Sequence, residues 1–221
     1  MANPDLTWLV FLLDRSGSMQ SIKSDVVGGF DAFLTEQRDG DGQCAVTLAQ
    51  FDDEYEVVYR GIDLEQVPAL ALHPRGCTAL LDAMGKLITD TAAEIDALPE
   101  ADRPGTVIVA IMTDGLENAS GEWRRPDIKA LVEQQTRDHG WEFLYMGADQ
   151  DAVEVGKGLG VKDGQALTYA RGKSREAMLA ASGNIRGYRD AKRRNTAAAM
   201  PEFTAEQRAE LADDTATSRD E

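Results

Sequence analysis

The chain has 221 residues, a formal net charge of −16 and a pI near 4.5. A surface this acidic repels nucleic acid and anionic membranes, so we expect neither as a partner. The length suits one sizeable domain with an appendage, and the apolar content is that of an ordinary globular protein.

The start of the chain lacks the charged beginning, long apolar middle and small-residue cleavage site of a signal peptide. The apolar run from Trp8 to Leu13 is far too short to span a bilayer. We therefore expect a cytoplasmic location. In that compartment Cys44 and Cys77 are expected to be free thiols rather than a disulfide.

The first elements in chain order are a predicted strand, a helix and a hairpin. Residues 7–13, TWLVFLL, have almost no polar interruption, which is typical of a parallel strand covered on both faces. Apolar residues recur at helical spacing over 18–37, which predicts a helix whose positive end lies at the end of that strand. The runs 44–51 and 55–60 flank the turn residues DDE and predict a hairpin.

Strands and helices then alternate to the end of the domain. The predicted elements are a helix over 78–97 capped by Thr78, a strand over 106–113, a helix over 126–138, a strand over 141–147, a helix over 149–158, a strand over 166–170 and a helix over 174–192. This order predicts a three-layer, Rossmann-like α/β fold. Its open sheet is expected to be mostly parallel, with one antiparallel edge strand from the hairpin and helices on both faces.

We place the domain at residues 5–193 and interpret 194–221 as an acidic tail or short helix. A capping box from Thr204 to Gln207 supports the helix. The segment 171–194 has eight basic and two acidic residues. It either pairs with the acidic body of the domain or docks a partner, and we favour internal pairing because charge runs usually form solvated faces.

Oxygen-bearing side chains gather at the predicted carboxyl ends of the strands, where open α/β sheets bind ligands. They are Asp14, Ser16 and Ser18 after the first strand, Thr78 in the loop before a helix, and Thr113 and Asp114 at the end of a later strand. Carboxylates and hydroxyls suit Mg²⁺, Mn²⁺ or Ca²⁺ better than zinc, and we predict Mg²⁺ with the other two as alternatives.

Each part of this pattern also has an ordinary structural interpretation. The run from Asp14 to Ser18 is compatible with a strand-to-helix turn, and the dipeptide Asp114-Gly115 with a simple turn. A second acidic group, Asp52, Asp53 and Glu54, is better explained by the hairpin turn than by a second metal. The metal interpretation depends on the separate pieces meeting in space.

The three pieces DRSGS, RGCTALLDA and TDGLEN together resemble the metal-ion-dependent adhesion site (MIDAS) of von Willebrand factor type A domains. The order of elements over roughly 5–193 also fits, and the short free-standing bacterial members are the most similar. The resemblance implies that the hydroxyls contact a metal directly or through water, while the aspartates balance its charge. The residues implied are Asp14, Ser16, Ser18, Thr78 and Asp114. A carboxylate of a partner protein would fill the last coordination position.

Three residues are expected at the rim of the site. Arg75 is placed to steer an acidic ligand, Gly115 follows the second aspartate, and Trp123 forms either a lid or part of a contact surface. Cys77, beside Thr78, is expected to be a packing residue.

We predict a binding module rather than an enzyme, with an Asp or Glu of another protein as its ligand. The resemblance suggests an intracellular bacterial adaptor, with an ATPase-associated complex as one candidate partner. The alternative is a Mg²⁺-dependent phosphatase or other hydrolase that uses Asp14 as nucleophile. Phosphatases of the haloacid dehalogenase type need a second aspartate two residues later, where this chain has Ser16.

Overall fold

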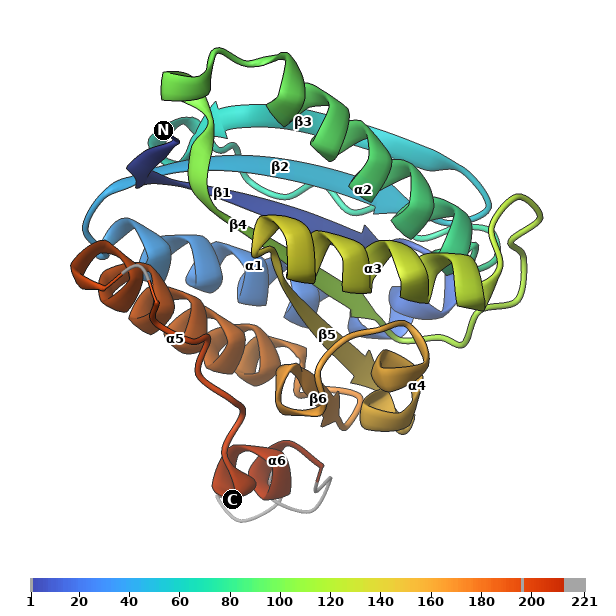
Figure 1. Cartoon of the computed structure of the whole chain (residues 1–221). Helices are drawn as coiled ribbons and strands as arrows, with labels where there is room; N and C mark the ends of the chain where they lie inside the picture. The colour runs from blue at the N-terminus through green and yellow to red at the C-terminus, as the bar shows by residue number, and fades with distance from the viewer. Residues whose placement is uncertain (1, 196, 213–221) are drawn as a thin grey trace.

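The computed structural model describes residues 2–195 and 197–212, within which a sheet of six strands carries helices on both faces (Figure 1). The strands are β1 (Asn3–Asp14), β2 (Gln43–Phe51), β3 (Tyr55–Asp63), β4 (Pro104–Thr113), β5 (Glu142–Ala148) and β6 (Ala166–Tyr169). The α-helices are α1 (Lys23–Arg38), α2 (Leu80–Ala97), α3 (Arg125–His139), α4 (Ala152–Gly158), α5 (Ser174–Arg194) and α6 (Ala205–Ala212). Within the described ranges, none of these helices has the length and apolar composition that a membrane span requires.

The strand order is β3-β2-β1-β4-β5-β6. β1 pairs in parallel with both β2 and β4, whereas the edge strand β3 runs antiparallel to β2. The predicted architecture, a mostly parallel sheet with one antiparallel edge strand, is therefore confirmed. From β1 the sheet first extends through β2 to β3, and the chain then returns to the other neighbour of β1, which is β4. The strand order therefore reverses between the carboxyl ends of β1 and β4.

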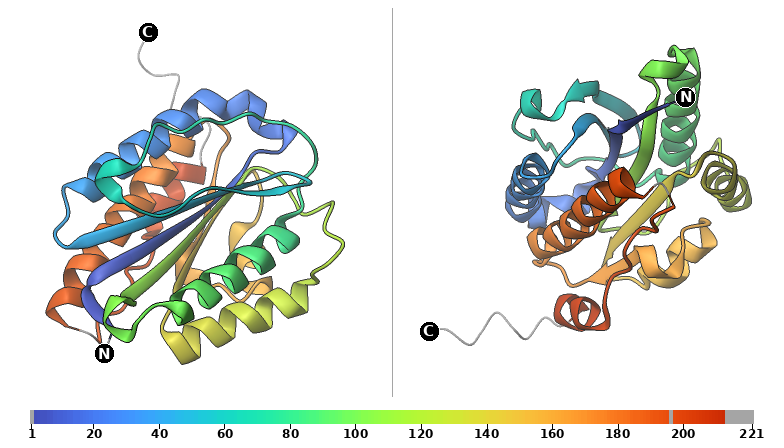
Figure 2. Two further views of the ribbon diagram at one scale, coloured as in Figure 1. Left: turned by 90° about the horizontal axis from the view of Figure 1, so that it is seen from above. Right: turned by 60° about the vertical axis from the view of Figure 1, so that its left-hand side comes forward.

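Side chains of β1 alternate between two hydrophobic layers. Phe11 lies in the layer under α1 and α5, where its ring meets Phe30 and Phe33 edge-on at centroid distances of 5.2 and 5.5 Å. Trp8 and Leu12 lie in the opposite layer, under α2 and α3. Figure 2 shows these helix pairs on the two sides of the sheet. Because β1 is buried on both faces, its sequence contains an uninterrupted run of apolar residues.

The first helix does not begin where its periodicity predicts. A 3₁₀ segment, η1 (Gly17–Ile22), follows the strand, and the α-helix starts only at Lys23. The Gly17 N–H donates to the carbonyl of Gly76 at 3.2 Å, and the Met19 N–H donates to the carbonyl of Ser16 at 3.0 Å. These contacts tighten the turn. The helical segment therefore begins at the end of β1 in 3₁₀ form, and its α-helical part starts later than predicted.

The segment after α5 covers the free edge of β6 (Figure 1). The Phe203 N–H donates to the carbonyl of Gly164 at 2.9 Å, and Arg208 Nη1 donates to the carbonyl of Ala166 at 2.6 Å. The predicted capping box is present, since Thr204 and Gln207 exchange hydrogen bonds of 2.9 and 3.2 Å. The division at residue 193 stays a prediction, and the end of the predicted tail, 213–221, lies outside the described residues.

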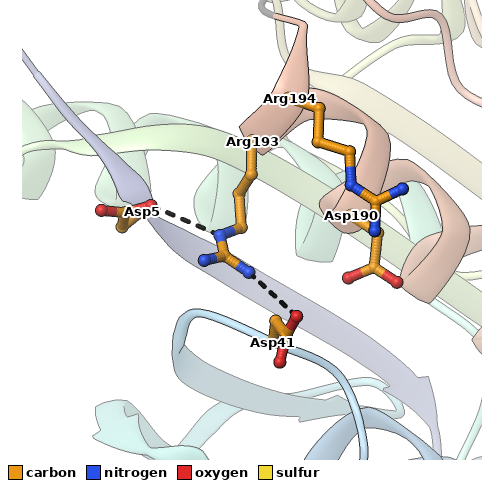
Figure 3. Close-up of a pocket in the computed structure, with 5 residues that line it drawn as sticks. All are labelled: Asp5, Asp41, Asp190, Arg193 and Arg194. Atoms are coloured by element: carbon orange, nitrogen blue, oxygen red, sulfur yellow. Dashed lines mark hydrogen bonds and ion pairs between the residues drawn. The ribbon is translucent and has the colours of Figure 1, made fainter.

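Two basic residues of α5, Arg186 and Arg193, pair with acidic residues of the rest of the domain. Arg186 Nη2 lies 3.7 Å from Glu36 Oε1. Arg193 bridges Asp5 and Asp41, at 3.3 and 3.5 Å, and all three residues line a small pocket (Figure 3). These ion pairs favour the internal-pairing interpretation of the basic segment.

Candidate metal site

The carboxylate of Asp14 joins the carboxyl ends of β1 and β4. It is fully buried. Its Oδ1 accepts the main-chain N–H of Ser16 at 2.6 Å, and its Oδ2 accepts the hydroxyl of Thr113 at 2.6 Å. Burial raises the pKa of Asp14 to about 6, although the hydrogen bonds from Thr113 and Ser16 lower it. A positive charge close by would favour the ionised form.

Ser16 and Ser18 connect this carboxylate to the second one. Their hydroxyl oxygens lie 3.1 Å apart. The Ser18 hydroxyl donates to Asp114 Oδ1 at 2.6 Å, across 96 positions of sequence. The first and third predicted pieces therefore meet at the carboxyl edge of the sheet.

Thr78 reaches the same place from the loop before α2. A Cβ added to Gly115 would lie 3.2 Å from Thr78 Oγ1 and 3.8 Å from Ser18 Oγ, so the two hydroxyls flank this glycine. Asn118 fixes the main chain of Thr78, accepting its N–H at 2.9 Å and donating to its carbonyl at 3.0 Å. A side chain at Gly115 would crowd the hydroxyls, which gives this predicted rim residue a steric role.

The predicted cap by Thr78 is wrong. α2 begins at Leu80, and the residue before it, Ala79, makes no side-chain cap. The first N–H groups of the helix are satisfied instead by the loop after β4, because Leu81 donates to Glu117 and Asp82 donates to Ser120, at 2.9 and 3.0 Å. The hydroxyl of Thr78 is therefore not needed to cap the helix.

Asp114 has a carboxylate oxygen with an unmet hydrogen-bonding capacity. Its Oδ2 is buried and finds no hydrogen bond within the described part of the chain. Arg171 Nη2 lies 3.5 Å away, at ion-pair distance. Burial raises the pKa of Asp114, while Ser18 and Arg171 act in the opposite direction. A buried carboxylate oxygen that accepts no hydrogen bond is what a cation-binding site would provide.

The donor set suits a hard divalent ion. It comprises two carboxylates and three hydroxyls, from Asp14, Asp114, Ser16, Ser18 and Thr78. Within residues 2–195 and 197–212, no three Asp, Glu, His or Cys side chains gather to hold a metal. An ion at this place would thus depend on hydroxyl and water oxygens, which Mg²⁺, Mn²⁺ and Ca²⁺ accept.

A loop that the sequence interpretation missed fastens the site to α2. The carboxylate of Asp82 accepts the main-chain N–H groups of Gly121, Glu122 and Trp123 at 2.7 to 3.0 Å. Since Glu117 and Ser120 bond to the same helix start, the loop and the helix cap each other. The sequence contains both the polar run ENAS (residues 117–120) and Asp82, in the first turn of α2. No local sequence pattern indicates that these two segments form hydrogen bonds with each other.

Two of the expected rim residues, Arg75 and Trp123, also make structural contacts. Arg75 donates to Asp52 at 2.8 Å and to Glu54 at 2.6 Å, so its charge is already paired. Its steering role is a poorer interpretation than a structural one. The ring of Trp123 packs on α2, where a Cβ at Gly85 would lie only 2.3 Å from it, and this contact anchors the loop.

The second acidic group is a turn, as expected. Glu54 donates its N–H to Asp52 Oδ1 at 2.6 Å, and the buried carboxylate of Asp52 also accepts Arg15 Nε at 2.9 Å. With Arg75 as a further partner, this carboxylate is already compensated by arginines. Both cysteines are free, but Cys77 is exposed, so its predicted packing role is wrong.

No protein-family model and no curated protein sequence matches the chain. Solved structures do match by fold. One is a von Willebrand factor type A protein from Catenulispora acidiphila, at 16% identity and a TM-score of 0.54 over 82% of this chain and 43% of that chain. Another is the vWF domain of the type V pili tip protein Mfa5 from Porphyromonas gingivalis, at 12% identity and a TM-score of 0.58 over 81% of this chain and 94% of that chain.

A third similar structure is proximal thread matrix protein 1 from the mussel byssus with a zinc-occupied MIDAS motif, at 14% identity and a TM-score of 0.54. The match covers 80% of this chain and 46% of that chain. The chain thus spans less than half the length of the Catenulispora and mussel proteins and nearly all of the Mfa5 domain.

Proposed function

We propose that this chain, which has the fold of von Willebrand factor type A domains, is a metal-ion-dependent protein-binding module without catalytic activity. One observation carries the proposal. Oxygens from three separate segments converge at the carboxyl edge of the sheet, beside a carboxylate oxygen of Asp114 that is buried without a hydrogen bond among the described residues. A divalent cation suits this combination of charge, burial and donor type.

Each residue of the set would have a defined part in holding the ion. Asp14 and Asp114 would balance its charge, and the hydroxyls of Ser16, Ser18 and Thr78 would add neutral oxygens, directly or through water. The Thr113 hydroxyl and the Ser16 N–H donate hydrogen bonds to the Asp14 carboxylate and so keep it in place. When bound, the ion supplies a position that attracts a carboxylate. We favour Mg²⁺, with Mn²⁺ or Ca²⁺ as alternatives.

The ligand we propose is an Asp or Glu side chain of another protein. A chain with a net charge of −16 repels acidic partners over most of its surface, so capture of a carboxylate requires a local positive centre. We propose a cytoplasmic adaptor of a bacterium, with an ATPase-associated complex as one candidate partner.

The hydrolase alternative has less support. Both oxygens of Asp14 accept short hydrogen bonds, from the Ser16 N–H and the Thr113 hydroxyl, which lowers their availability for attack on phosphorus. The acid/base aspartate that such a mechanism needs two residues later is replaced by Ser16.

The test is a pull-down with the wild type, Asp14→Ala and the exposed-site control Asp31→Ala, each in Mg²⁺ and in EDTA. We expect a defined set of proteins that the wild type and Asp31→Ala retain only in Mg²⁺ and that Asp14→Ala loses. Replacing the acidic residue of a recovered partner with its amide should then abolish capture. Retention that is insensitive to EDTA and to Asp14→Ala would contradict the proposal.

A further inference from the structure

Arg171 brings a positive charge of the chain itself to the candidate metal site. It follows β6, and its Nη2 lies 3.5 Å from Asp114 Oδ2 and 3.4 Å from the main-chain oxygen of Asp114. Its Nη1 donates to the hydroxyl of Ser21 at 3.2 Å. The carboxylate oxygen that it faces is the one without a hydrogen bond among the described residues. The guanidinium therefore partly offsets the charge of Asp114 from one side.

Asp149 holds this guanidinium in position. Its Oδ1 accepts the main-chain N–H of Arg171 at 3.0 Å, and its Oδ2 accepts Arg171 Nε at 3.1 Å. Asp149 has a left-handed backbone, with φ of 49°, and donates its own N–H to the carbonyl of Tyr169 at 3.0 Å. Aspartate is one of the few residue types that adopt this conformation readily. Both the backbone and the base of the Arg171 side chain are thus fixed.

We propose that Arg171 is a resident counter-cation of Asp114, which competes with the divalent ion and sets how tightly the site holds it. This inference rests on the proposed function, because it takes Asp114 to be one of the ion's ligands. A guanidinium stays protonated at any physiological pH, so its repulsion of a second cation is permanent. The arginine compensates Asp114 when no ion is bound and weakens binding when one is offered.

The test measures Mn²⁺ affinity by isothermal titration calorimetry on the wild type, Arg171→Gln and Arg171→Lys. Removing one positive charge a few ångströms from a partly solvated site should tighten Mn²⁺ binding on the order of tenfold. Arg171→Lys keeps the charge and should fall between the other two. The Arg171 side chain is 36% exposed, so we expect glutamine to be tolerated, and the melting temperature without metal checks this.

Arg193→Gln is the matched control. Its side chain is 35% exposed, and it also pairs with two aspartates. It lies beside the starts of β1 and β2, at the end of the strands opposite the candidate metal site (Figure 3). The substitution removes the same formal charge from the protein. Its Mn²⁺ affinity should stay within about twofold of the wild type, because a charge so distant is screened.

Three results would overturn the inference. Equal or weaker Mn²⁺ binding by Arg171→Gln would do so while leaving the metal site and the proposed function intact. Equal tightening by Arg171→Gln and Arg193→Gln would attribute the effect to total charge. If neither the wild type nor Arg171→Gln binds Mn²⁺, both the proposed function and the inference are contradicted.

Discussion

At the scale of single residues, the burial of Asp14 makes the site sensitive to pH. A carboxyl whose pKa rises from 3.8 to about 6 on folding binds its proton more tightly in the native state than in the unfolded state. Its contribution to stability is therefore complete below the unfolded pKa and is lost as the pH rises through about 6. The pKa difference corresponds to about 3 kcal/mol.

Asp14→Asn should stabilise the metal-free protein relative to the wild type, and we expect this gain to be about 2 kcal/mol larger at pH 7.5 than at pH 4.5. It is smaller than the full difference of about 3 kcal/mol because pH 4.5 already lies above the unfolded pKa of 3.8. Urea unfolding in EDTA at the two pH values measures this. Saturating Mg²⁺ at pH 7.5 should reverse the order, because the ion stabilises only the chain that binds it. A difference between the two proteins that does not change with pH would show that Asp14 titrates normally.

Thr78 contributes a hydroxyl to the candidate metal site and does not cap α2. A role in metal binding can therefore be measured separately from a role in stability. Thr78→Val keeps the shape of the side chain and removes the hydroxyl. We expect at least a fewfold loss of Mg²⁺ affinity with a change of less than about 1.5 kcal/mol in the unfolding free energy of the metal-free protein. Thr78→Ser, which keeps the hydroxyl, should retain the affinity. Equal loss of affinity in both variants would exclude the hydroxyl as the cause.

At the scale of elements, the loop after β4 and the start of α2 form one unit. Burial alone would raise the pKa of Asp82, yet the N–H groups of Gly121, Trp123 and Glu122 hold it below its usual value. Asparagine at this position offers one acceptor oxygen in place of two. We expect Asp82→Asn to cost about 1–3 kcal/mol of unfolding free energy and to speed hydrogen exchange of the three amides.

Asp90→Asn, on the same helix, is the control for this prediction. Its side chain is 48% exposed and lies 3.8 Å from Arg60, so its loss should cost less than about 1 kcal/mol. Similar costs in the two variants would mean that the loop is not held by Asp82.

Most of the elements could be predicted because their signals are local. The apolar run in β1, the helical spacing in α1 and Pro126 at the start of α3 each report on neighbouring residues. The same is true of the cluster around Asp14, whose first three oxygens lie within five residues.

The misses are non-local. α1 starts at Lys23 after a 3₁₀ segment whose first residue, Gly17, donates a hydrogen bond to the distant loop at Gly76. The capping of α2 by Glu117 and Ser120 spans more than 30 residues. Arg171 meets Asp114 across 57 positions. No periodicity or motif within a short window encodes such contacts, so they become visible only in the folded chain.

At the scale of the whole molecule, the segment after α5 completes the hydrophobic core and covers an edge strand. Phe203 is 4% exposed and lies in the layer under α1 and α5. We expect Phe203→Ala to lower the unfolding free energy by about 3 kcal/mol and to promote aggregation, because β6 would lose its cover. Leu179→Ala, at a residue that is 37% exposed, should cost much less. Equal effects on chemical unfolding would show that this segment does not stabilise the domain.

The acidic charge of the molecule and the cluster of convergent oxygens at the carboxyl ends of β1 and β4 lead to the same expectation, that this site binds a cation. Titration with Mn²⁺ followed by electron paramagnetic resonance measures this most directly, since bound ions lose the signal of the free ion. We predict about one Mn²⁺ per chain for the wild type and for Asp31→Ala, and none for Asp14→Ala or Asp114→Ala in the same range. Uptake that is absent from the wild type, or equal in Asp14→Ala, would contradict the account.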